Sequence, residues 1–213
     1  MNRGATVAQA HDFTHQYAES EDGVTFVLLH GTGGDEYALI GLGNALDADA
    51  GVMSPRGKIL ENGSPRFFRR LAEGVFDMED LVFRTHELAD WIEAAAAEYG
   101  IDRDTLVAVG YSNGANIAAS MLLLRPETLK RAILLRPMVP LVPESAPDLT
   151  GATVHIAAGA SDPLIPLKES ERLADLLKSY GAEVTFVRQP TGHQLVNADI
   201  AAAREWLQHI TNA

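Results

Sequence analysis

The chain has 213 residues and contains no cysteine, which excludes disulfides, thiol nucleophiles and thiolate metal sites. Its formal net charge of −12 argues against nucleic acid and anionic membranes as partners, because both would be repelled. No apolar run is long enough to span a bilayer and residues 1–21 lack a signal-peptide pattern, so we expect one cytoplasmic domain over residues 1–213, with no membrane insertion.

The beginning of the chain leads from a poorly patterned segment into a buried strand. Residues 1–22 show little pattern and are expected to form a loose arm or an edge strand. The continuous apolar run Val24–Leu29 is typical of a strand buried on both faces of a parallel sheet. Asp35 is expected to be the N-cap of the helix that follows. The next predicted elements are a helix over 36–46 and a short strand over 50–54, which Pro55 ends.

A long segment with weak periodicity then covers residues 56–80. A connection of this length inside a compact domain is usually either functional or disordered. It contains three phenylalanines, at positions 67, 68 and 76, and such apolar content argues against disorder. We therefore expect an ordered connection with a functional role.

The remainder of the chain alternates strands with helices at the spacing of a parallel α/β sheet. The fold class is therefore α/β, with a mainly parallel central sheet and helices on both faces. The predicted strands begin at residue 106 and cover 131–135, 153–157 and 183–188, and the predicted helices cover 81–99, 115–124, 167–180 and 197–210.

The most informative stretch is Gly110-Tyr111-Ser112-Asn113-Gly114. It follows an apolar strand and precedes a helix rich in small residues, which is the context in which G-x-S-x-G forms a sharp turn with an exposed serine. Side chains two positions either side of the apex would collide in such a turn, and Gly110 and Gly114 remove them. The five-residue pattern also arises by chance, so the context carries the prediction that Ser112 is a nucleophile.

Two further polar residues lie at the ends of later predicted strands. Asp162 follows the strand over 153–157, and His193 follows the strand over 183–188. Each has an ordinary interpretation, since Asp-Pro often starts a turn and a loop histidine is often a surface residue. Reactive groups of open α/β sheets collect at the carboxyl ends of strands, and the order Ser, Asp, His is that of α/β-hydrolases. The three residues together predict a catalytic triad, in which His193 is the base and Asp162 orients it.

The tetrahedral intermediate of such a reaction needs hydrogen-bond donors for its oxyanion. We expect the amides of Asn113 and Thr32 to provide them. The glycines of the loop after the first strand, Gly31, Gly33 and Gly34, allow its backbone to approach a substrate closely.

His30 precedes this glycine loop and is expected to hold it by hydrogen bonding. A phosphate cradle is the alternative interpretation of a glycine loop, but no Gly-Lys-Ser/Thr follows and the spacing fits no dinucleotide fingerprint.

Three blocks of the chain resemble one protein family. The sequence from residue 24 onward is similar to the phospholipase/carboxylesterase branch of the α/β-hydrolases, and within it to the MhqD-like subgroup of small bacterial serine esterases. The blocks that carry this resemblance are His30-Gly31-Thr32-Gly33-Gly34, the segment from Arg56 to Arg70 with Pro65-Arg66-Phe67-Phe68-Arg69-Arg70, and Gly110-Tyr111-Ser112-Asn113-Gly114-Ala115-Asn116.

The resemblance implies an α/β-hydrolase fold with about six to seven strands and little or no lid domain. It also implies Ser112, Asp162 and His193 as the triad of a carboxylesterase, with no metal and no cofactor, acting on short-chain carboxylic esters through an acyl-enzyme. Relatives act as acyl thioesterases or lysophospholipases, and both activities stay open, as does a non-catalytic protein that binds a small ligand. The related dienelactone hydrolases use a cysteine nucleophile, which this chain lacks.

The resemblance also suggests where the substrate and partners bind. The segment 56–80 is the candidate wall of the substrate pocket, with Phe67 and Phe68 as lining residues, and Met138 and Val139 are expected to approach from another loop. The alternative is that these aromatic residues only pack the segment onto the body of the protein. The expected partner is a small ester, contacted in addition by Gly31 and Gly33 of the glycine loop. Relatives pair as dimers, so a homodimer is open, although the sequence shows no exposed apolar stripe that would mark an interface.

Overall fold

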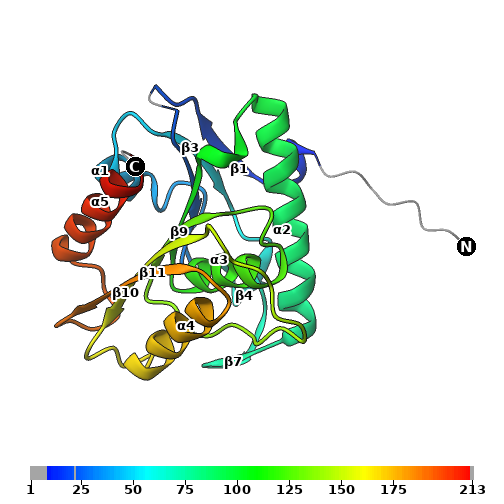
Figure 1. Ribbon diagram of the computed structural model, residues 1–213. Coiled ribbons are helices and arrows are strands. Elements are labelled where there is room, and N and C mark those ends of the chain that lie inside the picture. The colour runs from blue at the N-terminus through cyan, green and yellow to red at the C-terminus, as the bar shows by residue number, and fades with distance from the viewer. Residues whose placement is uncertain (1–8, 22, 212–213) are drawn as a thin grey trace, which may run out of the picture.

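The computed structural model describes residues 9–21 and 23–211 of the chain. Its centre is a seven-stranded sheet in the order β1-β3-β2-β8-β9-β10-β11, in which only β1 runs antiparallel to its neighbour (Figure 1). The predicted mainly parallel sheet is confirmed. The strands are β1 (His15–Ala18), β2 (Thr25–Leu29), β3 (Gly51–Pro55), β8 (Leu106–Tyr111), β9 (Arg131–Leu135), β10 (Thr153–Gly159) and β11 (Glu183–Gln189).

Helices cover both faces of this sheet, as predicted. They are α1 (Ile40–Leu46), α2 (Met78–Tyr99), α3 (Asn113–Leu124), α4 (Leu167–Ser179) and α5 (Asn197–Thr211), with short 3₁₀ turns η1 (Ala10–Asp12) and η2 (Arg103–Thr105). Figure 1 shows α1 and α5 together on one side and α2 on the other. The side chains of β2 alternate between two apolar cores, with Val27 and Leu29 facing α2 and α3, and Phe26 and Leu28 facing α1 and α5. Burial on both faces explains why this strand is mostly apolar and has no charged residue.

The N-terminal prediction of an arm or edge strand is resolved by β1, which pairs with β3 at one edge of the sheet. Residues 1–8 of the predicted arm lie outside the described residues. The prediction for the first helix was wrong at its start, since α1 begins at Ile40 and not at residue 36. The Asp35 carboxylate accepts from the amide of Tyr37 and so caps a turn of residues 35–38, in which Ala38 N–H bonds to the Asp35 carbonyl.

The segment 56–80 is not an irregular connection but holds two hairpins, β4 (Ile59–Glu61) with β5 (Ser64–Arg66) and β6 (Arg70–Ala72) with β7 (Val75–Phe76). The first turns at Asn62-Gly63, with φ angles of 50° and 83°. Asn-Gly is the strongest short signal for such a turn, because both residues tolerate a positive φ. The strands are only two or three residues long, too short for alternating hydrophobicity to reveal them.

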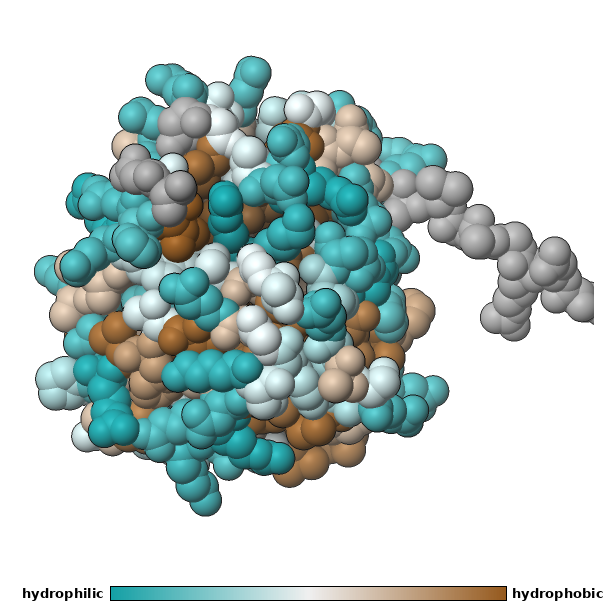
Figure 2. All heavy atoms as spheres, viewed as in Figure 1, coloured by the Kyte–Doolittle hydropathy of each residue, from teal (hydrophilic) through white to brown (hydrophobic). Residues whose placement is uncertain are grey.

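The surface is largely hydrophilic in the view of Figure 2, with apolar residues gathered at its lower edge over β7. The exposed large apolar side chains of this region come from the second hairpin and the first turns of α2, namely Leu71, Val75, Met78, Val82 and Phe83. The sequence pattern did not predict this patch. Among the described residues no helix is long and apolar enough to cross a membrane, and none of their His, Asp and Glu side chains form a group of three that could hold a metal.

One core residue is unusual for its chemistry. His155 lies on β10, fully buried beside the ring of Trp206, and neither of its ring nitrogens has a hydrogen-bond partner among the described residues. This burial lowers the pKa of His155 from 6.5 to about 4, because a charged imidazolium would lose its hydration.

We expect this histidine to destabilise the protein in mild acid. Between pH 6.5 and 4 the unfolded chain binds a proton that the folded state does not, so the free energy of unfolding falls as the pH falls. At 1.36 kcal/mol per pKa unit, the loss from pH 7 to pH 5 is about 2 kcal/mol for this group alone. Urea unfolding of the wild type and His155→Leu at both pH values measures it. A pH dependence equally steep in the variant would contradict the prediction.

Candidate active site

Ser112 stands at the apex of a strained turn between β8 and α3. Its φ and ψ are 52° and −111°, a conformation that non-glycine residues rarely adopt. A Cβ on Gly110 would lie 2.6 Å from the Gly114 carbonyl oxygen, and a Cβ on Gly114 would overlap the Leu29 carbonyl at the end of β2. Any larger residue at either position would therefore collide with the backbone. The two glycines let α3 pack directly on the sheet, and Ser112 projects from the carboxyl edge of the sheet.

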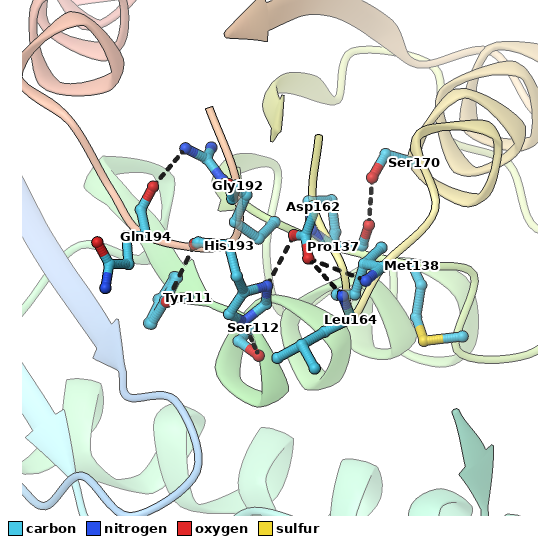
Figure 3. A network of polar contacts seen from close by, with 12 residues as sticks. Tyr111, Ser112, Pro137, Met138, Asp162, Leu164, Ser170, Gly192, His193 and Gln194 are labelled. Atoms are coloured by element: carbon cyan, nitrogen blue, oxygen red, sulfur yellow. Dashed lines mark hydrogen bonds and ion pairs between the residues drawn. The ribbon is translucent and has the colours of Figure 1, made fainter. Parts of the chain in front are cut away.

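Ser112, His193 and Asp162 form one hydrogen-bonded chain (Figure 3). His193 Nε2 lies 3.0 Å from Ser112 Oγ, and His193 Nδ1 lies 2.7 Å from Asp162 Oδ2. The three residues follow the ends of β8, β10 and β11. β9 pairs in parallel with β8 and with β10, and β10 pairs in parallel with β11, so all these ends lie at one edge of the sheet. The structure thus brings together the three side chains that the sequence singles out.

The Asp162 carboxylate is fixed from two sides. Its Oδ1 accepts from the amides of Leu164 at 2.8 Å and Ile165 at 3.0 Å, and its Oδ2 faces the imidazole. An ionised carboxylate only accepts hydrogen bonds, so the ring proton belongs on His193 Nδ1. This tautomer leaves the lone pair of Nε2 directed at the Ser112 hydroxyl, which is the arrangement that a general base needs.

Two residues of the cavity lining have backbone amides that donate to no other described residue. The amide of Asn113 is the first of α3 and has no acceptor within the helix. The amide of Thr32 likewise donates to no other described residue. Both residues line the cavity next to Ser112. Their amides are the donors expected for an oxyanion.

His30 holds the glycine loop, as the sequence suggested. Its Nε2 accepts from the amide of Gly57 at 2.9 Å, so its Nδ1 carries the proton and donates to the Gly31 carbonyl at 2.7 Å. Burial lowers the pKa of His30, since the charged ring would be desolvated. The ring is therefore neutral at pH 7, and it joins the glycine loop to the segment between β3 and β4.

The first hairpin, β4–β5, also holds the glycine loop by hydrogen bonds. Arg66 Nη1 donates to Thr32 Oγ1 at 2.6 Å, and the amide of Gly33 donates to the Pro65 carbonyl at 2.9 Å. The amide of Phe67 donates to the side-chain oxygen of Asn113 at 2.8 Å. Strand β5 and the residue after it thus link the two sides of the space above Ser112.

The cavity that opens at Ser112 has a volume of about 260 Å³. The β6–β7 hairpin forms one wall, and the segments after β9 and β10 form the other. Its lining residues are Thr32, Arg66, Arg70, Glu73, Gly74, Phe76, Tyr111, Ser112, Asn113, Asn116, Met138, Leu164, Ile165 and His193. The arginines at this site are paired, since Arg70 binds Glu61 and Glu73, and Arg66 lies 3.4 Å from Glu61.

Only part of the expected pocket wall lines this cavity. Met138 does, and its amide donates to Asn116 Oδ1 at 2.9 Å. Phe67 and Phe68 are buried in the core and do not line the cavity, because their rings pack against His30 and Phe76, respectively. The structure also leaves Val139, Gly31 and Gly33 outside the lining, with Val139 buried in the same core as the two phenylalanines.

Several site residues were missed by sequence reasoning. The sequence pattern identifies Phe76 only as an apolar residue of an ordered segment, although Glu73-Gly74 is a signal for the turn of the hairpin that carries it. Tyr111 lines the cavity from within the G-x-S-x-G turn itself. Leu164 and Ile165 follow Asp162 directly, and their place in the wall follows from the turn that their amides make with its carboxylate.

Comparison with known proteins finds a matching family and similar structures. The family model of the phospholipase/carboxylesterases matches residues 77–211. MhqD of Bacillus subtilis (strain 168), which is named as a hydrolase, is 49% identical over 192 residues, 90% of this chain and 96% of the relative. The crystal structure of the Bacillus cereus carboxylesterase superposes with a TM-score of 0.91 at 48% identity, covering 93% of this chain and 94% of that one. A carboxylesterase from Mesorhizobium loti superposes with a TM-score of 0.84 at 35% identity, covering 89% and 90%.

Proposed function

The chain belongs to the phospholipase/carboxylesterase family of α/β-hydrolases, and from this premise we propose that it is a serine carboxylesterase for short-chain esters. The observation that carries the proposal is the hydrogen-bonded chain from Ser112 through His193 to Asp162, at the mouth of a small cavity. The carboxylesterase structures to which the chain is similar support the same reaction class.

In the first half of the reaction, Ser112 Oγ attacks the ester carbonyl carbon while its proton passes to His193 Nε2. Asp162 stabilises the imidazolium that forms, through the hydrogen bond at Nδ1. The carbonyl oxygen becomes an oxyanion and accepts from the amides of Asn113 and Thr32. When the tetrahedral intermediate collapses, the carbon–oxygen bond to the alcohol breaks, His193 returns the proton to the alcohol oxygen, and the acyl group stays on Ser112.

The second half repeats these steps with water. His193 takes a proton from a water molecule, whose oxygen attacks the acyl carbon, and the same two amides receive the oxyanion. The bond to Ser112 Oγ then breaks, and His193 gives the proton back to the serine. The products are one carboxylic acid and one alcohol, and the protein is regenerated without any other reactant.

The size of the cavity supports short acyl chains. Drug-sized ligands occupy pockets of roughly 300–1,000 Å³, and the cavity at Ser112 has about 260 Å³. Phe76, Met138 and Leu164 supply an apolar lining that suits a few methylene groups. A long acyl chain would leave apolar surface in water, where it gains no binding energy.

The test is the rate of hydrolysis of p-nitrophenyl acetate, butyrate, octanoate and palmitate. We expect kcat/KM to be highest for acetate or butyrate and to fall by about tenfold or more towards octanoate, a difference of about 1.4 kcal/mol in transition-state binding. A phosphonate ester that labels serine nucleophiles should attach to Ser112 in a 1:1 ratio, as peptide mass spectrometry can measure.

The same preparation is assayed with an acetyl thioester and with lysophosphatidylcholine. A preference of more than tenfold for the thioester over the matched oxygen ester would assign the protein as a thioesterase. A preference for the lysolipid or the palmitate would overturn the short-chain proposal. A correctly folded protein that turns over none of these substrates would instead be a ligand-binding member of the family.

A further inference from the structure

The end of β9 lies between the two strands that carry Ser112 and Asp162. The amide of Ser112 donates to the Leu135 carbonyl at 2.9 Å, and the amide of the next residue, Arg136, donates to the Ala157 carbonyl on β10 at 2.8 Å. Arg136 has a φ of 56°, in the left-handed region that a non-glycine residue enters only when its surroundings hold it there. The chain therefore turns sharply at this residue, at the end of β9 and between β8 and β10.

The Arg136 side chain holds the loop that bears His193. Its Nε donates to the Gly192 carbonyl at 3.1 Å, and its Nη2 donates to the Gln194 carbonyl at 2.9 Å. These are the residues immediately before and after His193. Because the guanidinium is planar and rigid, it fixes both carbonyls relative to the end of β9.

The remaining guanidinium contacts anchor the group. Asp199 accepts from Nη1 at 2.9 Å and from Nη2 at 2.7 Å, and neither side chain has any exposed surface. The Ala157 carbonyl accepts a further bond from Nη1 at 3.1 Å. A buried ion pair is a weak source of stability, since its desolvation offsets its attraction. The Arg136–Asp199 pair and the strained backbone of Arg136 both lie next to the loop that bears His193. A gain in stability does not explain why they are there.

A separate contact fixes the residue between the two carbonyls. Tyr111 Oη donates to the carbonyl of His193 itself at 3.1 Å (Figure 3). Burial raises the pKa of Tyr111, so the hydroxyl stays protonated and can donate. Three consecutive carbonyls, from Gly192 to Gln194, are thus each held by a side chain from the edge of the sheet. The rotation of the His193 backbone is restricted on both sides.

We propose that Arg136 is a positioning residue for His193, which it holds through the carbonyls of Gly192 and Gln194 so that Nε2 faces Ser112 Oγ. The proposal rests on the proposed function, in which His193 is the base. Arg136 does not line the cavity. Its loss should therefore change the rate of the chemical steps and leave substrate binding nearly unchanged.

The main test is Arg136→Lys, which keeps the charge opposite Asp199 but cannot reach both carbonyls with one ammonium group. We expect kcat for p-nitrophenyl acetate to fall by about 10- to 100-fold, because small displacements of a base have effects of this size, while KM changes by less than about threefold. Arg125→Lys is the matched control, since Arg125 binds Asp90, Glu93 and Glu127 at the far end of α3. This control should keep the kcat of the wild type.

A second variant separates position from stability. Arg136→Met combined with Asp199→Leu removes both charges together, and such replacements of a buried pair are often neutral or stabilising. We expect this double variant to fold and still to show the loss in kcat. It also covers the case in which Arg136→Lys does not fold.

Proton NMR provides a measurement that does not depend on turnover. The downfield signal of the His193 Nδ1–H bound to Asp162, assigned by its absence in His193→Ala, should be sharp in the wild type and in Arg125→Lys. It should broaden or vanish in the Arg136 variants. A folded Arg136 variant with an unchanged signal and a kcat within about twofold of the wild type would overturn the proposal. A wild type with the signal but without esterase activity would contradict the proposed function, while the signal would still test Arg136.

Discussion

The Ser112→Ala variant should lose esterase activity by about 10³- to 10⁶-fold in kcat while folding as the wild type does. The acyl-enzyme cannot form without the serine oxygen, and the residual rate would come from the two amides and from substrate binding alone. In this variant His193 still binds Asp162, and Asp162 still accepts from the Leu164 amide, so the substitution leaves no buried charge without a partner. Initial rates with p-nitrophenyl acetate, and melting curves by circular dichroism, measure the two parts of the prediction.

Ser179→Ala is a suitable control, because Ser179 is an exposed serine at the end of α4 whose hydroxyl donates to the Leu176 carbonyl. It should retain the full rate. Removing Ser112 and His193 together should cost about as much as removing Ser112 alone, since the two act as a unit. Turnover at the wild-type rate in a folded Ser112→Ala protein would refute the covalent mechanism.

Of the substitutions considered, Gly114→Ala should lower the free energy of unfolding the most. A Cβ at this position would overlap the Leu29 carbonyl of β2, and the contact is with backbone on both sides, so no side-chain movement can relieve it. Helix α3 would have to move away from the sheet in a densely packed core. We expect a loss of more than about 4 kcal/mol in the free energy of unfolding, or no folded protein at all, since whole domains are stable by only about 5–15 kcal/mol.

Gly41→Ala is the matched substitution. Gly41 lies inside the short helix α1, is exposed, and would have no atom within 4 Å of an added Cβ. Alanine is the better helix former, so this variant should be as stable as the wild type or more stable by up to about 1 kcal/mol. Urea unfolding of both variants compares them directly. A Gly114→Ala protein as stable as Gly41→Ala would show that α3 can shift from the sheet at little cost.

The sequence predicted those parts of the fold in which the polarity of each residue matches its burial. Val27 and Leu28 of β2 face opposite layers of helices, so a run with no charged residue already implied a sheet covered on both faces. The two hairpins between β3 and α2 were missed because their strands are short and partly exposed. Phe67 was assigned to the pocket on its apolar character, yet its ring packs on His30 in the interior. Apolar character predicts burial but does not say against which neighbours.

The site shows the same division. Ser112, Asp162 and His193 each follow a strand of the predicted parallel sheet, and strand ends meet at one edge, so their proximity could be predicted from chain order. Arg136 also follows a strand, but its role depends on two carbonyl groups more than fifty residues further along the chain. A carbonyl is present in every residue, and no pattern of side chains could have identified these two.

The β6–β7 hairpin has a consequence for how such a protein can change. It contributes Arg70, Glu73, Gly74 and Phe76 to the cavity wall, while its two strands pair with each other and add no strand to the central sheet. The end of β9 holds both the Ser112 amide, through the Leu135 carbonyl, and the loop of His193, through the Arg136 side chain. The hairpin can therefore be lengthened, shortened or replaced while the distance between Ser112 Oγ and His193 Nε2 stays the same. Substrate range can then change while the reaction chemistry is kept. A library of variants with different hairpin lengths would alter the range of substrates and leave the triad unchanged.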